Sequence, residues 1–182
     1  MGCSLTASID FGREILKTMH AFKDMGATIS FDPNVRLEML KYTNAFDLVQ
    51  EVYRNCQIFM PGVSELLMIT GENETEAAIK KAFEENGRLK LIVLKNGSKG
   101  SSIYTRNGLE VVQQIFRVEQ VDATGAGDCF DAAFICGLAE GKSLKEAAQM
   151  GAAAGALNVM AFGPMEGRIT RETIQEMIIK NR

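Results

Sequence analysis

The residues best suited to chemistry lie together in residues 121–130, with the sequence Val-Asp-Ala-Thr-Gly-Ala-Gly-Asp-Cys-Phe. Gly125 and Gly127 flank Ala126 at the expected entry to a helix, so the backbone can turn tightly and direct several N–H groups at one spot. Such a cluster carries partial positive charge and binds anions. Asp128 follows at once, although a carboxylate repels the anion that the N–H groups attract. Its position therefore needs an explanation.

Two explanations of Asp128 are open on these residues alone. In the first, the N–H groups stabilise charge on a group in transfer, while Asp128 takes the proton of the attacking hydroxyl. In the second, Asp128 is a first-turn acid that complements the helix dipole, and the glycines serve an ordinary turn. The choice depends on what the rest of the chain places beside this stretch.

Hydrophobic periodicity predicts that helices and strands alternate along the chain. Helices are expected at residues 8–25, 37–55 in one or two pieces, from about 63 to 71, 74–85, 130–139, 144–159 and 171–180. Strands are expected at residues 27–31, 57–60 and 91–94, followed by a hairpin of residues 101–105 and 109–112 across Asn107-Gly108. This order predicts one domain over residues 1–182, with a three-layer α/β/α fold around a mostly parallel sheet.

Four polar loops follow four of the predicted strands: residues 32–36, 62–65, 95–100 and 122–128. Taken singly, each has an ordinary explanation as a turn, a helix cap, a solvated acid or hairpin glycines. The carboxyl ends of parallel strands open on one edge of a sheet, which is where ligands bind in α/β folds. The four loops together therefore predict one shared site.

Composition and charge argue against several classes of function. The 182 residues carry a net charge of −3 with a pI near 5.3, which disfavours nucleic acid or an anionic membrane as the main partner. The apolar run at residues 147–162 is too short and too interrupted by glycine to span a membrane. Four separated cysteines and one histidine, His20, make no metal-binding pattern. We expect reduced thiols in a cytoplasmic protein.

The motifs in these loops resemble those of the ribokinase-like, PfkB-type carbohydrate kinases. Residues 122–128 match the specific D-[TA]-T-G-A-G-D signature of that family. Residues 32–36, Asp-Pro-Asn-Val-Arg, match its D-x-N-x-R element, and residues 95–100, Lys-Asn-Gly-Ser-Lys-Gly, match its K-x-G-x-x-G element. The resemblance runs from Gly2 to about Gly167 and is to the C-terminal portion of family members.

The resemblance implies an ATP-dependent sugar kinase that transfers a γ-phosphoryl group to a hydroxyl of a sugar or keto sugar acid. Asp128 would be the general base, and the amides of Gly125, Ala126 and Gly127 would form the anion hole. The implied nucleotide contacts are Lys95, Gly97, Gly100, Asn158 and Gly163, with Asn34 and Arg36 near the phosphates or an acidic sugar. The implied cations are Mg²⁺, tied to Glu65 and held largely through water, and in some members a monovalent cation near Asp122 and Thr124.

The sequence departs from the family pattern in two respects. The N-x-x-E element after the second strand begins here with Gly62, so only Glu65 remains to position a metal or phosphate. The chain also resembles only part of the usual length, without the half that supplies the lid and most sugar contacts. We therefore expect an exposed sheet edge, which invites dimerisation or pairing with another chain.

Two further functions compete with the kinase. A catalytically inactive fragment or interaction module would keep the fold without turnover, in accord with Gly62 and the chain length. A dinucleotide-dependent oxidoreductase is disfavoured, because the glycine-rich turn lies late in the chain and lacks the G-x-G-x-x-G pattern. Within the kinase family the substrate class stays open between a keto sugar acid, such as 2-keto-3-deoxygluconate, and a fructose-type sugar.

Overall fold

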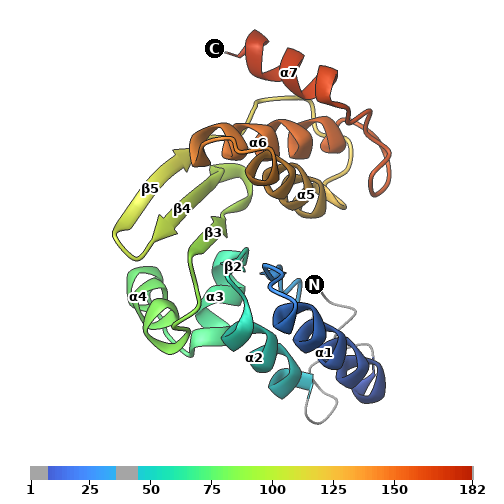
Figure 1. Cartoon of the computed structure of the whole chain (residues 1–182). Coiled ribbons are helices and arrows are strands. Elements are labelled where there is room, and N and C mark those ends of the chain that lie inside the picture. Colours follow the sequence, from blue (N-terminus) through green and yellow to red (C-terminus); the bar gives the residue numbers. More distant parts are fainter. Residues whose placement is uncertain (1–7, 36–44, 182) are drawn as a thin grey trace. The chain divides into compact units, whose positions relative to one another are not determined.

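A computed structural model describes residues 8–35 and 45–181 of the protein, and Figure 1 labels its elements. The helices are α1 (Ile9–Asp24), α2 (Ala45–Asn55), α3 (Val63–Thr70), α4 (Thr75–Glu85), α5 (Ala126–Ala139), α6 (Leu144–Val159) and α7 (Arg171–Lys180). The strands are β1 (Ser30–Phe31), β2 (Ile58–Phe59), β3 (Leu91–Lys95), β4 (Ser101–Thr105) and β5 (Gly108–Gln113). None of the described helices is long and apolar enough to cross a membrane.

The five strands form one sheet in the order β1-β2-β3-β4-β5. β1 to β3 pair in parallel, with Ser30 opposite Ile58 and Ile58 opposite Leu91. Only two residues, Arg106 and Asn107, connect β4 to β5, and so short a connection joins antiparallel neighbours. The sheet is therefore mixed, and the predicted α/β fold of ribokinase-like type is confirmed.

Contacts divide the chain into two compact units. Unit 1 contains the residues up to Leu94 together with Tyr104–Gly108, and unit 2 contains Lys95–Ile103 and the residues from Leu109 onward. Each unit has its own cluster of buried hydrophobic side chains. The single domain expected over residues 1–182 stays a prediction.

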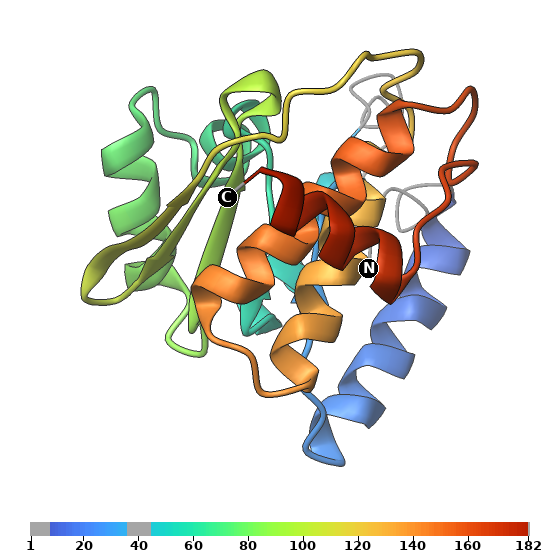
Figure 2. The same cartoon turned by 90° about the horizontal axis from the view of Figure 1, so that it is seen from above.

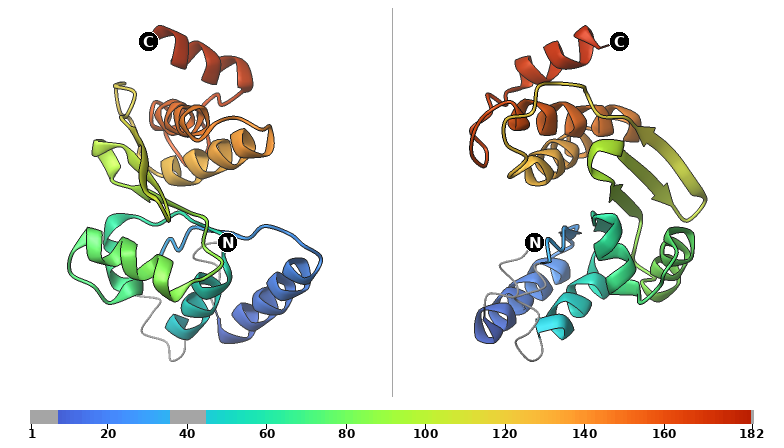
Figure 3. Two further views of the ribbon diagram at one scale, coloured as in Figure 1. Left: turned by 60° about the vertical axis from the view of Figure 1, so that its left-hand side comes forward. Right: turned by 180° about the vertical axis from the view of Figure 1, so that it is seen from behind.

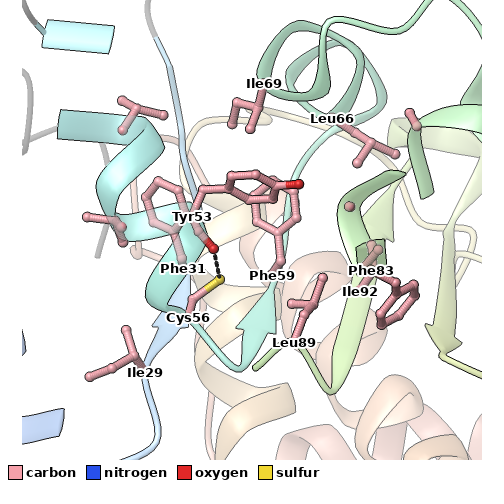
Figure 4. Close-up of a cluster of buried hydrophobic side chains, with 14 of the residues drawn as sticks. Ile29, Phe31, Tyr53, Cys56, Phe59, Leu66, Ile69, Phe83, Leu89 and Ile92 are labelled. Carbon is pink, nitrogen blue, oxygen red and sulfur yellow. Dashed lines mark hydrogen bonds between the residues drawn. The ribbon is translucent and has the colours of Figure 1, made fainter. Parts of the chain in front are cut away.

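The core of unit 1 is aromatic at its centre. Phe31 of β1, Tyr53 of α2 and Phe59 of β2 are fully buried, with ring centroids 5.9 Å apart for Phe31–Phe59 and 5.2 Å apart for Tyr53–Phe59 (Figure 4). The Cys56 thiol donates to the Tyr53 carbonyl at 3.3 Å. Burial raises the pKa of this thiol to about 12. The thiol therefore stays protonated at neutral pH and acts as a small core residue.

Asn86, the residue after α4, makes polar contacts with the end of α2 at the edge of this core. Its side chain is buried, and Nδ2 donates to the carbonyls of Tyr53 and Cys56 at 2.6 and 2.9 Å. Its Oδ1 accepts from the Arg88 amide at 2.9 Å. Carbonyl groups at the end of a helix have no partner within that helix. Asn86 thus satisfies backbone groups where α2 ends, inside an apolar surrounding.

We expect Asn86→Ala to lower the free energy of unfolding by about 2–4 kcal/mol, because it leaves buried backbone groups without partners. Urea denaturation, followed by far-UV circular dichroism, measures this change. Asn73→Ala, at an exposed position of the same unit, should shift stability by less than about 0.5 kcal/mol. Equal effects of the two substitutions would mean that the Asn86 contacts contribute nothing particular.

Small residues let the helices of unit 2 pack closely. A side chain on Gly137 of α5 would meet Ala147 of α6 at 3.1 Å, and one on Gly151 of α6 would meet Phe130 at 3.0 Å. Figure 2 shows α5 and α6 side by side, with α7 packed along α6. In the buried cluster here, α5 and α6 contribute alanine and cysteine side chains and α7 contributes two isoleucines: Cys129, Ala133, Ala153, Ala154, Ile174 and Ile178. The helix predicted at residues 144–159 is confirmed as α6.

The remaining predicted elements differ mainly at their ends. α5 begins at Ala126, four residues before the expected start, so Gly127 and Asp128 lie inside the helix and Gly125 directly precedes it. β1 and β2 are two residues each, shorter than the runs 27–31 and 57–60. In unit 1, α3 and α4 lie side by side, as Figure 3 shows, and Gly71 ends α3 as expected. Part of the helix predicted at residues 37–55 lies outside the described residues, and α2 forms its second part.

Candidate active site

The glycine-rich stretch forms the N-terminus of α5. Gly125 is the residue before the helix and has a φ of +79°, a conformation that favours glycine. The Ala126 amide donates to the Ala123 carbonyl at 3.2 Å. In the part of the chain that the structure describes, no protein acceptor takes the Gly125 or Gly127 amide, and Gly127 lies in the first turn, where helix amides have no internal partner. Two of the three predicted anion-hole amides thus remain available for an anion.

Asp122 holds this turn in place. Its Oδ1 accepts from the amide and the hydroxyl of Thr124 at 2.9 and 2.7 Å, and its Oδ2 accepts from the Gly163 amide at 3.0 Å. These donors, with the Thr124 amide contributing most, hold the pKa of the Asp122 carboxyl below its ordinary value. Three of the roughly four lone-pair positions of a carboxylate are therefore in use. A cation-binding role for Asp122 and Thr124 stays a prediction.

Residues 158–165 pack against the glycine-rich turn. Asn158, in the last turn of α6, is fully buried, and its Nδ2 donates to the Thr124 carbonyl at 2.7 Å. The Val159 carbonyl accepts from the amides of Val121 and Asp122. A side chain on Gly125 would meet the backbone of Pro164 at 3.2 Å. The predicted nucleotide residues Asn158 and Gly163 thus lie beside the glycine-rich turn and fix its backbone.

Asp128 is exposed in the first turn of α5. Among the described residues its carboxylate accepts no hydrogen bond and forms no ion pair. Glu146 shows what a first-turn acid does when it serves a helix end, because its Oε2 accepts from the Ser143 amide at 2.9 Å. Asp128 makes no such cap. Its position in the first turn of α5 also suits an acid that complements the helix dipole, so the catalytic role of Asp128 stays a prediction.

Lys95 places a positive charge beside the turn. It is the last residue of β3, and its Nζ lies 2.8 Å from Oδ2 of Asp131 in α5, with both side chains more than four-fifths buried. The Nζ also lies 3.7 Å from the point where a Cβ on Gly127 would stand. The ammonium therefore lies next to the N-terminus of the helix, within contact distance of residue 127.

The loop after Lys95 is a tight glycine turn. The Asn96 amide donates to the Gly100 carbonyl at 2.8 Å, and Gly97–Lys99 form one 3₁₀ turn. Gly97 and Gly100 both have positive φ, +52° and +87°. The Gly100 backbone approaches that of Gln113 so closely that a Cβ would lie 2.1 Å from the Gln113 carbonyl oxygen. The two glycines therefore shape this loop, whatever else they contact.

In unit 1 the structure brings two of the predicted loops together through Glu65. Its Oε1 accepts from the Val35 amide and its Oε2 from the Gly62 amide, both at 2.7 Å. Asn34, with a φ of +42°, is held in a turn in which its amide donates to Asp32 at 3.2 Å. Glu65 thus joins the loop after β1 to the first turn of α3. Gly62 takes part through its backbone, and Arg36 lies outside the described residues.

The predicted site residues fall into two groups, one in each unit. In unit 2, Lys95 lies against the turn that contains Asp128, and in unit 1 the Asp32 loop meets Glu65. The convergence of all four loops at one sheet edge stays a prediction. No group of three or more His, Cys, Asp or Glu that could hold a metal ion occurs within residues 8–35 and 45–181.

Sequence reasoning missed Asp131. A signal for it was present, because it lies three residues after Asp128 in an otherwise apolar helix, and side chains three apart share a helix face. Its partner Lys95 lies 36 residues away, so no local pattern could join the two. The backbone contacts of Glu65 were missed for the same reason.

Comparison with known proteins identifies relatives of this chain. The model of the pfkB family of carbohydrate kinases matches residues 10–171. A 2-dehydro-3-deoxygluconokinase of Bacillus subtilis is 35% identical over 170 residues, which cover 91% of this chain and 52% of that protein. A 5-dehydro-2-deoxygluconokinase of Clostridium perfringens is 28% identical over 171 residues, which cover 92% of this chain and 50% of that protein.

Solved structures agree with these matches. An E. coli protein with the provisional name Ribokinase II, crystallised with ATP and Mg²⁺, superposes with a TM-score of 0.92 at 35% identity. The superposition covers 98% of this chain and 57% of that protein. The chain spans about half the length of the relatives it matches. Family match and structural likeness agree, and the chain belongs to the pfkB family of carbohydrate kinases.

Proposed function

We propose that this chain carries the ATP-binding and phosphoryl-transfer centre of a sugar kinase that phosphorylates a hydroxyl of a sugar or keto sugar acid. The observation that best supports this proposal is that Asp128 is exposed and unpaired at the N-terminus of α5, where the Gly125 and Gly127 amides remain available for an anion. A receptor for an anion and a free carboxylate side by side suit a reaction in which phosphate and hydroxyl meet. The family membership supports the same reaction class.

In this proposal some residues of unit 2 act on the sugar hydroxyl and others on the phosphoryl group of ATP. The Asp128 carboxylate accepts the proton of the attacking hydroxyl as the new O–P bond forms and the bond to the departing nucleoside diphosphate breaks. The amides of Gly125 and Gly127 stabilise the charge on the oxygens of the phosphoryl group in transfer. The Lys95 ammonium adds positive charge beside them. Asp122 and Asn158 hold the turn rigid, so that these donors need no rearrangement during transfer.

Mg²⁺ fits this arrangement as an ion held mainly by the nucleotide. When bound, it would neutralise part of the phosphate charge. Glu65 is the residue that we assign to it, acting through water, because both of its oxygens already accept a backbone amide. The protein would thus orient a hydrated ion rather than enclose it.

The name of one relative suggests the substrate class. The Bacillus subtilis relative is named for a keto sugar acid, 2-dehydro-3-deoxygluconate. We propose a sugar or sugar acid of this kind as the acceptor, with Arg36 as the residue suited to its carboxylate because a guanidinium binds oxyanions in a fork.

We expect the chain to bind ATP–Mg²⁺ with a dissociation constant between about 1 μM and 1 mM, the usual range for enzyme substrates. Isothermal titration measures the binding, and a panel of 2-keto-3-deoxygluconate, fructose and ribose then tests transfer. No ATP binding at millimolar nucleotide would overturn the proposal. Binding of ATP without phosphorylation of any sugar, even when the part of a relative that this chain does not span is supplied separately, would favour the inactive module.

A further inference from the structure

We propose that Asp131 is a positioning residue, which holds the Lys95 ammonium beside the amides of the glycine-rich turn so that Lys95 can bind the phosphates of a nucleotide. This inference rests on the proposed function, because it assigns a further residue to the same phosphate site. It concerns unit 2 alone, where Lys95, Gly127 and Asp131 all lie.

The first argument is the burial of the pair. The Lys95 and Asp131 side chains are 18% and 14% exposed, and their charged atoms lie 2.8 Å apart. An ion pair taken out of water gains little over apolar side chains of similar volume, because each charge loses its hydration. A pair in this place, between β3 and the mostly apolar helix α5, is therefore poorly explained by stability. It is well explained by a need to keep one of its charges at a fixed point.

The second argument is where the fixed charge lies. The Lys95 Nζ stands 3.7 Å from the position of a Cβ on Gly127, next to the first turn of α5. The N-terminus of a helix is itself partly positive, so a bare ammonium there is repelled by the helix dipole. The Asp131 carboxylate, one turn further along the same helix, offsets that repulsion. Removal of this carboxylate should therefore weaken the hold on the ammonium at this position.

The third argument distinguishes Asp131 from Asp128, which lies three residues earlier. Asp128 is exposed and unpaired, so its charge acts on a bound phosphate directly. Asp131 forms a buried ion pair with Lys95, so we expect its main effect on a phosphate to pass through the lysine. Removing the two charges should therefore change phosphate affinity in opposite directions.

The test compares Asp131→Asn, Lys95→Met, the double variant and Glu140→Gln with the unsubstituted chain. Glu140→Gln is the matched control, because it removes the same charge next to the C-terminal end of α5, where Glu140 forms an exposed ion pair with Arg171. Isothermal titration uses three probes: ATP–Mg²⁺, inorganic tripolyphosphate and adenosine. Tripolyphosphate reports on the phosphate site alone, and adenosine reports on the rest of the nucleotide site.

We expect Asp131→Asn and Lys95→Met each to weaken ATP–Mg²⁺ and tripolyphosphate about tenfold or more, the effect of one charge-assisted contact. Adenosine affinity should stay within about twofold of the control, and the double variant should bind no more weakly than Lys95→Met. Unchanged or tighter tripolyphosphate binding in Asp131→Asn overturns the inference alone. Equal losses for adenosine and tripolyphosphate also overturn it, because they indicate a general structural defect. If the unsubstituted chain binds no ATP, the proposed function falls and this inference with it.

Discussion

Asp128→Asn is expected to abolish most phosphoryl transfer while tightening the binding of ATP. A positioned general base contributes about 10²–10⁴ to a rate, so transfer to the sugar hydroxyl should fall by that factor. The amide has nearly the shape of the carboxylate, so the turn from Asp122 to Asp128 should keep its structure. The expected rise in affinity follows from charge, because the substitution removes a carboxylate beside the phosphate site.

The size of the affinity change follows from Coulomb's law. Two unit charges roughly 6 Å apart interact with about 0.7 kcal/mol in bulk water and more near a protein surface, which corresponds to a threefold or larger change in the dissociation constant. Isothermal titration of ATP–Mg²⁺ and a coupled assay of ADP release measure the two effects separately. The binding arm is informative whether or not the chain alone turns over.

The matched control for this prediction is Glu172→Gln. Glu172 is also an exposed acid in the first turn of a helix, α7, at a distance in sequence from the glycine-rich turn. The control should change neither ATP affinity nor transfer. If Asp128→Asn behaved like this control, Asp128 would be an ordinary first-turn acid and the catalytic assignment would be wrong.

Local patterns predicted the elements of this fold better than its contacts. The bounds of α6 and α7 follow from Ser143 and Thr170, whose side chains accept from amides of the first turn and so fix where each helix begins. The lengths of the short strands β1 and β2 were overestimated, because a strand ends where the neighbouring strand no longer pairs with it. Ser30 and Phe31 pair with Ile58 and Phe59, and the predicted runs continue beyond these pairs.

The residues of the candidate site likewise include some that local patterns predict and some that depend on tertiary contacts. The glycines and Asp128 were predictable because they lie within one contiguous motif. Asp131 and the backbone contacts of Glu65 were not, because they depend on partners at residues 95 and 35 that only the tertiary structure brings near. The early start of α5 has a local cause that was misjudged: the positive φ of Gly125 ends the turn, and the helix begins at the next residue.

Gly100→Ala is expected to destabilise unit 2 strongly. The added Cβ would stand 2.1 Å from the Gln113 carbonyl oxygen and 3.1 Å from Cα of Gln114, so backbone must move away from backbone. Gly100 also has φ +87° and ψ −143°, a region that residues other than glycine rarely enter. Strain of about 1–3 kcal/mol and a steric cost of similar size give a loss of roughly 2–6 kcal/mol in the free energy of unfolding.

Gly141→Ala separates the two causes. Gly141, after α5 in the same unit, has φ +76°, but a Cβ there meets nothing within 4 Å. It should cost only about 1 kcal/mol, the usual penalty of a left-handed residue with a side chain. Urea denaturation of both variants gives the difference. A similar loss in both would show that the close approach adds nothing, whereas a loss for Gly100→Ala that exceeds that of Gly141→Ala by more than about 2 kcal/mol, the largest difference in strain, would show that the close approach of residues 100 and 113 fixes the loop that follows Lys95.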